Sequence, residues 1–177
     1  RGTGGLGRDF RKMTYQQLGK YETQDQIEAA QYLASLPYID GERIGIWGWS
    51  YGGYMAAMGV LKHPDVFKAG IVNAGVTDWR HYDTIYTERY MNLPQDNRSG
   101  YRSGSCMTYV KDLKGHLLIM HGLEDDNVHP NNAWQLIDAL DRAGKRYESR
   151  FFPRAGHGTG GADTRREFFR RHLGGPV

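Results

Sequence analysis

Gly48-Trp49-Ser50-Tyr51-Gly52-Gly53 lies between an apolar run of β-type residues, 43–47, and a run of helical character, 51–61. A G-x-S-x-G pattern directly after a strand and before a helix is typical of a nucleophile elbow, a sharp turn that exposes the serine hydroxyl. We therefore predict that Ser50 is a nucleophile. Gly48 and Gly52 are expected to be required, because side chains at these positions would collide across the turn. A glycine-rich turn without chemistry is the alternative interpretation.

Two later strands end in loops that contain candidate partners for Ser50. A serine hydroxyl becomes an effective nucleophile when a histidine accepts its proton and a carboxylate fixes the tautomer of that histidine. The apolar run 115–120 leads into the loop 121–127, which holds three adjacent carboxylates, and the strand-like run 147–152 leads to His157 between two glycines. The residues alone do not choose among these carboxylates, which are Glu124, Asp125 and Asp126. The chain order serine, acid, histidine is that of α/β-hydrolases.

Strand-like and helical runs alternate along the chain, which is typical of a parallel sheet with crossover helices. Thr23 and Gln26 are predicted to form a capping box at the start of the first long helix. Residues 78–108 are predicted to be irregular, and so long a connection is expected to carry function. The predicted strands are 44–47, 69–73, 117–120 and 147–152, and the predicted helices are 23–36, 51–61, 131–143 and one at the C-terminus.

Length and composition are those of one globular domain, with 177 residues and a net charge of +3. No apolar run approaches the roughly 18 residues of a membrane span, and the N-terminus does not have the form of a signal peptide. Because the chain begins at Arg1 rather than a methionine, we interpret it as a processed or excised fragment whose compartment the sequence does not reveal. The single cysteine, Cys106, excludes an internal disulfide, and we expect no metal and no cofactor.

The basic stretch 165–172 is predicted to be an amphipathic helix. Phe168, Phe169 and Leu173 would form its packed side, and its basic face is expected to lie in solvent rather than on nucleic acid.

Three segments, 47–54, 82–91 and 121–129, together resemble the catalytic domain of the dipeptidyl peptidase IV branch of the prolyl oligopeptidase family of serine peptidases. Many hydrolases share the elbow, whereas the tyrosine-rich second segment is specific to this branch. The resemblance covers nearly the whole chain. It implies that residues 1–177 are part of an α/β-hydrolase catalytic domain, the C-terminal portion of a mostly parallel sheet with helices on both faces. The first strands and a β-propeller would lie upstream.

The resemblance also implies roles for residues at matching positions. Ser50 would be the nucleophile, His157 the base and Asp125 the acid, and Asn127 would bind the substrate's carbonyl group. A flat apolar pocket would hold the proline before the scissile bond, since a pyrrolidine ring buries well against aromatic faces. Core packing is the favoured explanation for any one of the tyrosines of this pocket alone, but their clustering in one long insertion beside the elbow favours a pocket. The implied pocket walls are Tyr51, Val76, Trp79, Tyr82, Tyr86 and Val128.

The backbone N–H of Tyr51, the residue after the nucleophile, is expected to be one donor of an oxyanion hole. The resemblance implies that the second donor is a tyrosine upstream of Arg1, so the isolated chain is expected to be poorly active. It implies a peptide substrate and a homodimer for the full-length protein, and it favours a periplasmic or extracellular location over the cytoplasm.

Three functions remain as hypotheses at this stage. The first is a serine peptidase that releases dipeptides with proline or alanine in the second position. The second is another acyl transfer on the same three residues, by an esterase or an acylaminoacyl peptidase. The third is a non-catalytic fragment that acts in assembly or partner binding.

Overall fold

A four-stranded parallel sheet, in the order β1-β2-β3-β4, forms the centre of residues 1–174, which the computed structural model describes. The last three residues of the predicted domain 1–177 lie outside the described residues. Every predicted strand is present, although β1 and β3 continue further than predicted at their carboxyl ends. The strands are β1 (Gly45–Trp49), β2 (Ala69–Asn73), β3 (His116–Gly122) and β4 (Glu148–Phe152).

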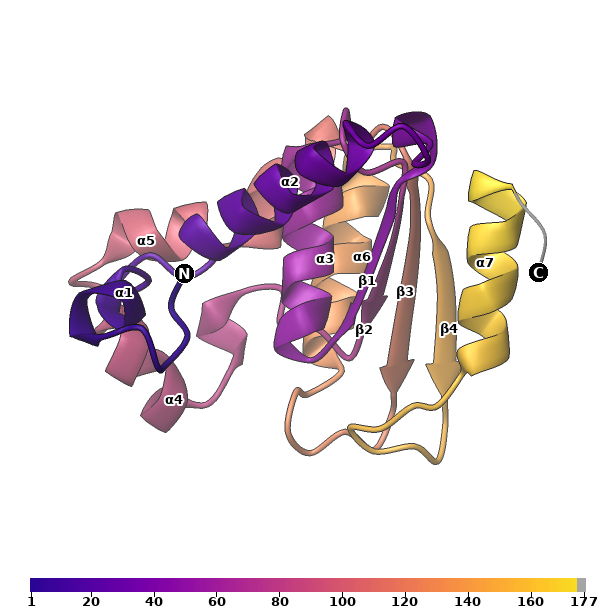
Figure 1. The fold of residues 1–177 in the computed structure, drawn as a ribbon. Coiled ribbons are helices and arrows are strands. Elements are labelled where there is room, and N and C mark those ends of the chain that lie inside the picture. Colours follow the sequence, from indigo (N-terminus) through magenta and orange to yellow (C-terminus); the bar gives the residue numbers. More distant parts are fainter. Residues whose placement is uncertain (175–177) are drawn as a thin grey trace.

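Helices cover both faces of this sheet (Figure 1). α3 and α6 pack on one face, with α2 against α3, and α7 packs on the other. Because successive strand residues point to opposite faces, Leu117 and Ile119 join the core under α3 and α6, whereas Leu118 and Met120 contact Phe168 of α7. These helices are α2 (Tyr21–Ala34), α3 (Tyr51–Lys62), α6 (Asn131–Arg142) and α7 (Ala162–Leu173). The arrangement is that of an α/β-hydrolase fold, as predicted.

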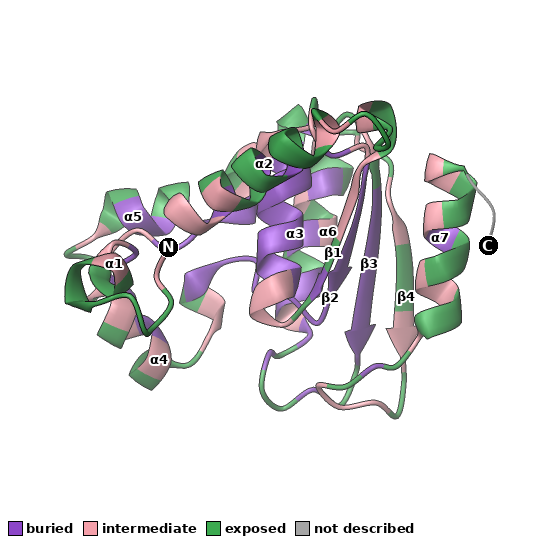
Figure 2. Cartoon of the chain, viewed as in Figure 1, coloured by how far each residue is buried: buried purple, intermediate pink, exposed green. Residues whose placement is uncertain are grey.

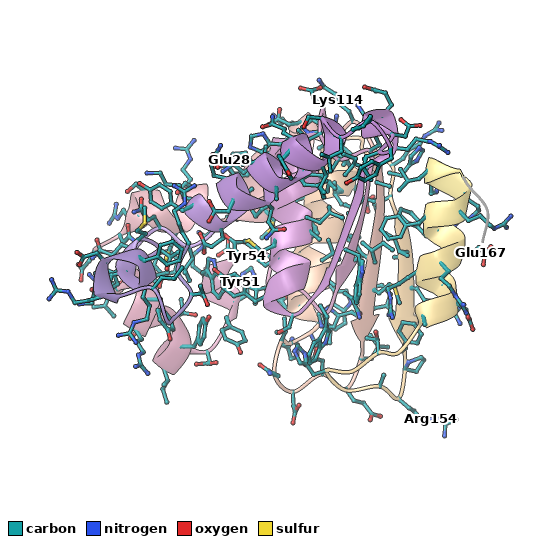
Figure 3. All side chains as sticks on the ribbon, in the orientation of Figure 1. Glu28, Tyr51, Tyr54, Lys114, Arg154 and Glu167 are labelled. Carbon is teal, nitrogen blue, oxygen red and sulfur yellow. The ribbon has the colours of Figure 1, made fainter. Side chains whose placement is uncertain are left out.

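Burial follows this layering, with β2 and β3 buried and the outward sides of the helices exposed (Figure 2). Phe168 is fully buried, and Phe169 and Leu173 pack beside it, so α7 uses the predicted apolar side. The side chains of Tyr54, which is fully buried, and Tyr51 extend from α3 toward the helices that lie beside the sheet (Figure 3). None of the helices within residues 1–174 has the length and hydropathy that a membrane crossing needs.

The first long helix begins earlier than predicted. Thr23 lies inside the first turn of α2, where its hydroxyl donates to the carbonyl of Gly19 at 2.9 Å. The carboxylate of Glu22 accepts the backbone N–H of Gly19 at 3.2 Å. The predicted capping box of Thr23 and Gln26 is therefore wrong, because the side chain that accepts the backbone N–H just before the helix is that of Glu22.

The stretch 78–108 is helical in several places, so the prediction of an irregular connection was wrong. Asp78, Asp83 and Asn97 each cap a short helix, with a side-chain oxygen that accepts a backbone N–H of the first turn. These caps were the available signal, since the helices are too short for a clear apolar period. The elements here are η2 (Trp79–His81), α4 (Thr84–Met91), α5 (Arg98–Ser103) and η3 (Cys106–Asp112), and α1 (Arg8–Lys12) and η1 (Gly41–Arg43) lie nearer the N-terminus.

β1 is the edge strand on one side of the described sheet. Trp47 and Trp49 lie on this strand, and their exposed fractions are 51% and 49%. The guanidinium of Arg165 lies 4.6 Å from the ring centroid of Trp47. The two indoles are thus equally exposed but have different neighbours.

Candidate active site

The elbow has the strained backbone that its sequence predicts. Ser50 follows β1 and precedes α3, with φ 59° and ψ −121°, a conformation that side chains disfavour. A Cβ at Gly48 would lie 2.1 Å from the backbone of Gly52, so glycine is required at Gly48. A Cβ at Gly52 would meet nothing within 4 Å, so the predicted requirement there is wrong. The second required glycine is Gly53, where a Cβ would lie 2.8 Å from the carbonyl oxygen of Asn73.

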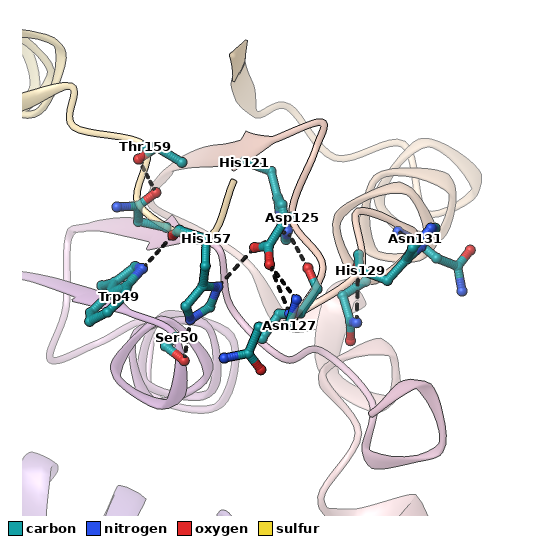
Figure 4. Close-up of polar contacts among 12 residues, drawn as sticks. Trp49, Ser50, His121, Asp125, Asn127, His129, Asn131, His157 and Thr159 are labelled. Carbon is teal, nitrogen blue, oxygen red and sulfur yellow. Dashed lines mark hydrogen bonds and ion pairs between the residues drawn. The ribbon is translucent and has the colours of Figure 1, made fainter. Parts of the chain in front are cut away.

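Ser50, His157 and Asp125 form a continuous chain of hydrogen bonds (Figure 4). The distance from Asp125 Oδ2 to His157 Nδ1 is 2.9 Å, and from His157 Nε2 to Ser50 Oγ it is also 2.9 Å. Because the carboxylate can only accept, Nδ1 carries the ring proton, and Nε2 of the neutral ring accepts from the serine hydroxyl. The three residues follow the carboxyl ends of β1, β3 and β4, the edge at which open α/β sheets build their sites.

The structure distinguishes the three adjacent carboxylates of the loop after β3. Glu124 and Asp126 are exposed, whereas Asp125 is buried and contacts His157. The second oxygen of Asp125, Oδ1, accepts the backbone N–H groups of Asn127 and Val128 at 3.0 and 2.9 Å. These bonds fix which oxygen faces the histidine.

His121 is a buried contact of Asp125 that the sequence reasoning did not assign to the site. Its Nε2 donates to the carbonyl of Val128 at 2.7 Å and lies 3.2 Å from Asp125 Oδ2. Burial lowers the pKa of His121 and outweighs the opposing effects of the Val128 carbonyl and the Asp125 carboxylate. The ring is therefore neutral at neutral pH and braces the acid loop through an N–H donor.

The lowered pKa of His121 predicts that acidity destabilises the fold. At pH values below its unfolded pKa of 6.5, the unfolded chain binds more protons than the folded chain, so the free energy of unfolding falls as the pH falls. We expect this loss between about pH 7 and pH 5, and we expect His121→Gln, which keeps an N–H donor but cannot titrate, to lose less. Urea unfolding of both proteins at the two pH values measures the difference, and equal losses would contradict it.

Tyr51 stands at the positive end of α3. As the first residue of the helix it has no intrahelical acceptor for its backbone N–H, which adjoins Ser50. Its hydroxyl donates to the carboxylate of Glu22 on α2. Burial, followed by the neighbouring charge of Glu22, raises the pKa of Tyr51, so the hydroxyl stays protonated.

The six predicted pocket residues lie together in one apolar cluster. The ring centroids of Tyr51 and Trp79 are 5.5 Å apart, and Trp79 stacks on Tyr86 at 5.9 Å with an interplanar angle of 17°. The ring of Tyr82 contacts Tyr86 at 5.3 Å. Val76, Trp79 and Val128 are buried and form the base of the cluster, whereas Tyr51, Tyr82 and Tyr86 keep part of their rings accessible.

Asn127 and Tyr82, which the sequence assigns to different tasks, are bonded to one another. The hydroxyl of Tyr82 donates to Asn127 Oδ1 at 2.7 Å. With this oxygen occupied, the amide nitrogen of Asn127 remains as a donor beside the site. A cavity of about 290 Å³ borders Tyr51 and Tyr86 on the side of Glu22. Within residues 1–174 no group of three potential ligand side chains is placed to hold a metal ion.

The model of the prolyl oligopeptidase family matches residues 1–174. The chain belongs to the prolyl oligopeptidase family. The chain is 48% identical over 160 residues to a probable dipeptidyl-aminopeptidase B of Metarhizium robertsii. This match covers 89% of the chain and 18% of the relative. A probable dipeptidyl peptidase 4 of Aspergillus clavatus is 49% identical over 142 residues, covering 79% of this chain and 18% of the relative.

The crystal structure of Porphyromonas gingivalis dipeptidyl peptidase 4 has the same fold as this family member. The TM-score is 0.93 at 44% sequence identity, and the match covers 98% of this chain and 26% of that protein. The chain thus spans about a fifth to a quarter of the length of these relatives.

Proposed function

We propose that this chain carries the acyl-transfer site of a serine peptidase that releases dipeptides with proline or alanine in the second position. Residues 1–177 would form one part of its α/β-hydrolase catalytic domain. The observation that carries the proposal is the pair of 2.9 Å hydrogen bonds that joins Ser50, His157 and Asp125 from three different strand ends. Similarity to proteins named dipeptidyl peptidases supports the substrate class.

Each member of the triad has one chemical task in the proposed reaction. Ser50 Oγ attacks the carbonyl carbon of the proline or alanine residue in the second position, while His157 Nε2 accepts the hydroxyl proton. The imidazolium then donates this proton to the leaving amine as the C–N bond breaks. A water molecule attacks the resulting acyl-enzyme with His157 again as the base, which releases the dipeptide and restores Ser50. Asp125 stabilises the imidazolium through Nδ1.

Charge on the substrate oxygen develops beside the N-terminus of α3 in this scheme. The backbone N–H of Tyr51 is placed to donate to it, and the helix dipole favours negative charge there. The amide nitrogen of Asn127, whose oxygen is held by Tyr82, would bind the carbonyl group of the preceding residue. Both groups are oriented before substrate binds, which reduces the reorganisation that the reaction requires.

The aromatic cluster would select proline. The partly exposed rings of Tyr51, Tyr82 and Tyr86 each pack against the buried ring of Trp79, and the proline would lie on their exposed faces. A pyrrolidine ring has no N–H to desolvate and packs well on aromatic faces. Alanine would lie on the same faces with less contact.

Tyr86→Ala in the full-length protein tests this assignment. Loss of one pocket ring should remove about 1–3 kcal/mol of contact with proline, a fall of about 5- to 150-fold in kcat/KM for X-Pro substrates. Hydrolysis of a small activated ester should fall much less, because the lost contacts do not touch its reacting carbonyl. Kinetics with both substrates give the ratio.

Tyr38→Ala provides a matched control, since Tyr38 is 78% exposed. It should change neither rate. Equal losses on both substrates in Tyr86→Ala would contradict the pocket and would favour a general acyl hydrolase, such as an esterase, on the same triad.

A further inference from the structure

The histidine of the triad lies in a connection without regular secondary structure. His157 is part of the loop between β4 and α7, a segment with neither helix nor strand. Ser50, in contrast, sits between β1 and α3. Because a misplacement of about 1 Å in a catalytic group can cost about 100-fold in rate, contacts outside the triad must hold this loop at its 2.9 Å distance from Ser50.

The first such contact comes from the end of β1. The indole Nε1 of Trp49 donates to the backbone carbonyl of His157 at 2.7 Å. The same indole packs on the imidazole, with ring centroids 4.8 Å apart and an interplanar angle of 42°. Trp49 directly precedes Ser50, so the residue next to the nucleophile holds both the main chain and the ring of the base (Figure 4).

The second contact comes from the end of β2 and holds Thr159, two residues after His157 in the chain. The hydroxyl of Thr159 donates to Asn73 Oδ1 at 2.7 Å, and both residues are buried, with exposed fractions of 8% and 3%. The backbone carbonyl of Asn73 accepts the N–H of Ser50 at 2.9 Å. Asn73 is therefore tied to the nucleophile through its main chain and to the histidine loop through its side chain.

Because Thr159 and Asn73 are buried, loss of their hydrogen bond is costly. Loss of one partner from a buried hydrogen bond leaves the other unsatisfied, at a cost of about 1–3 kcal/mol. The loop can avoid that cost only by moving so that water or another group reaches Asn73. Such a move would change the distance between His157 Nε2 and Ser50 Oγ.

We propose that Trp49 and the Asn73–Thr159 pair are positioning residues that anchor His157 to the ends of β1 and β2 and so set its distance from Ser50. This inference rests on the proposed function. The anchors touch neither the reacting carbonyl nor the serine hydroxyl, so their effect reaches the reaction only through the placement of the imidazole.

Thr159→Val and Thr159→Ser in the full-length protein separate the hydrogen bond from packing. Valine keeps the shape and removes the hydroxyl, whereas serine keeps the hydroxyl. With a small activated ester we expect Thr159→Val to lower kcat about 10- to 100-fold with KM little changed. Thr159→Ser should restore kcat to within about threefold of the starting protein. Equal kcat values in the two variants would overturn the proposal for this pair.

Trp49→Phe tests the other anchor at a half-exposed position where folding is not at risk. It keeps a ring against His157 and loses the N–H donor, and it should also lower kcat about tenfold. Trp47→Phe is the matched control, because Trp47 is equally exposed and contacts Arg165 instead. If Thr159→Val does not fold, the comparison of Trp49→Phe with Trp47→Phe still tests the proposal. Equal rates for Trp49→Phe and Trp47→Phe would overturn the role of Trp49.

The proton resonance of His157 Nδ1–H provides a readout that a purely structural role would not move. We expect it to shift or broaden in Thr159→Val and Trp49→Phe but not in Trp47→Phe. Failure of the proposed function would be seen separately, as activity that survives Ser50→Ala. Failure of this inference would be seen as wild-type rates in both anchor variants together with an inactive Ser50→Ala.

Discussion

Ser50→Ala in the full-length protein is expected to lower kcat by about a million-fold, the scale found when a serine-peptidase triad loses its nucleophile. His157→Ala should cost a similar factor, because Ser50 Oγ then has no acceptor for its proton. The double variant should be little worse than either single one, since the two residues act as a unit. Steady-state kinetics on an X-Pro substrate measure all three losses.

A covalent phosphonate probe gives an independent test of the same prediction. It should label Ser50 in the starting protein and fail to label Ser50→Ala. Ser99→Ala, at an exposed serine of α5, is a suitable control and should keep full activity and labelling. Activity in Ser50→Ala within tenfold of the starting protein would end the serine-hydrolase proposal.

Asp125→Asn is expected to lower kcat about 10,000-fold, because the substitution reverses the imidazole tautomer. The amide oxygen should take the place of Oδ1, which accepts two backbone N–H groups, so the amide nitrogen should take the place of Oδ2. That nitrogen would donate to His157 Nδ1, the ring proton would move to Nε2, and Nε2 could no longer accept the proton of Ser50. Kinetics on an X-Pro substrate measure the loss.

Asp126→Asn is the matched control for this change. Asp126 is the next residue along the chain, carries the same charge and is exposed, so its replacement should cost less than about threefold. A larger loss in Asp126→Asn than in Asp125→Asn would show that the wrong acid has been assigned.

Local patterns in the sequence determined the order of the strands and of the helices that cover the sheet, and the strand ends that carry Ser50 and His157. An elbow can be read from sequence because a strand, a steric requirement at Gly48 and a helix all lie within a few residues. The parallel sheet can be read because strands and helices have different apolar periods. The choice of Asp125 among three carboxylates came from the family resemblance rather than from these patterns.

Contacts between distant segments decided the rest, because no local pattern encodes them. Gly53 is required, and Gly52 is not, owing to the approach of α3 to the chain after β2. His121 braces the acid because β3 buries its ring against Asp125 and the Val128 carbonyl. The anchors of the histidine loop come from β1 and β2, far from it in sequence. The sequence by itself therefore determined which residue types meet at the sheet edge, whereas only the tertiary structure decided which atoms face one another, since that depends on packing between strands that are not neighbours in the chain.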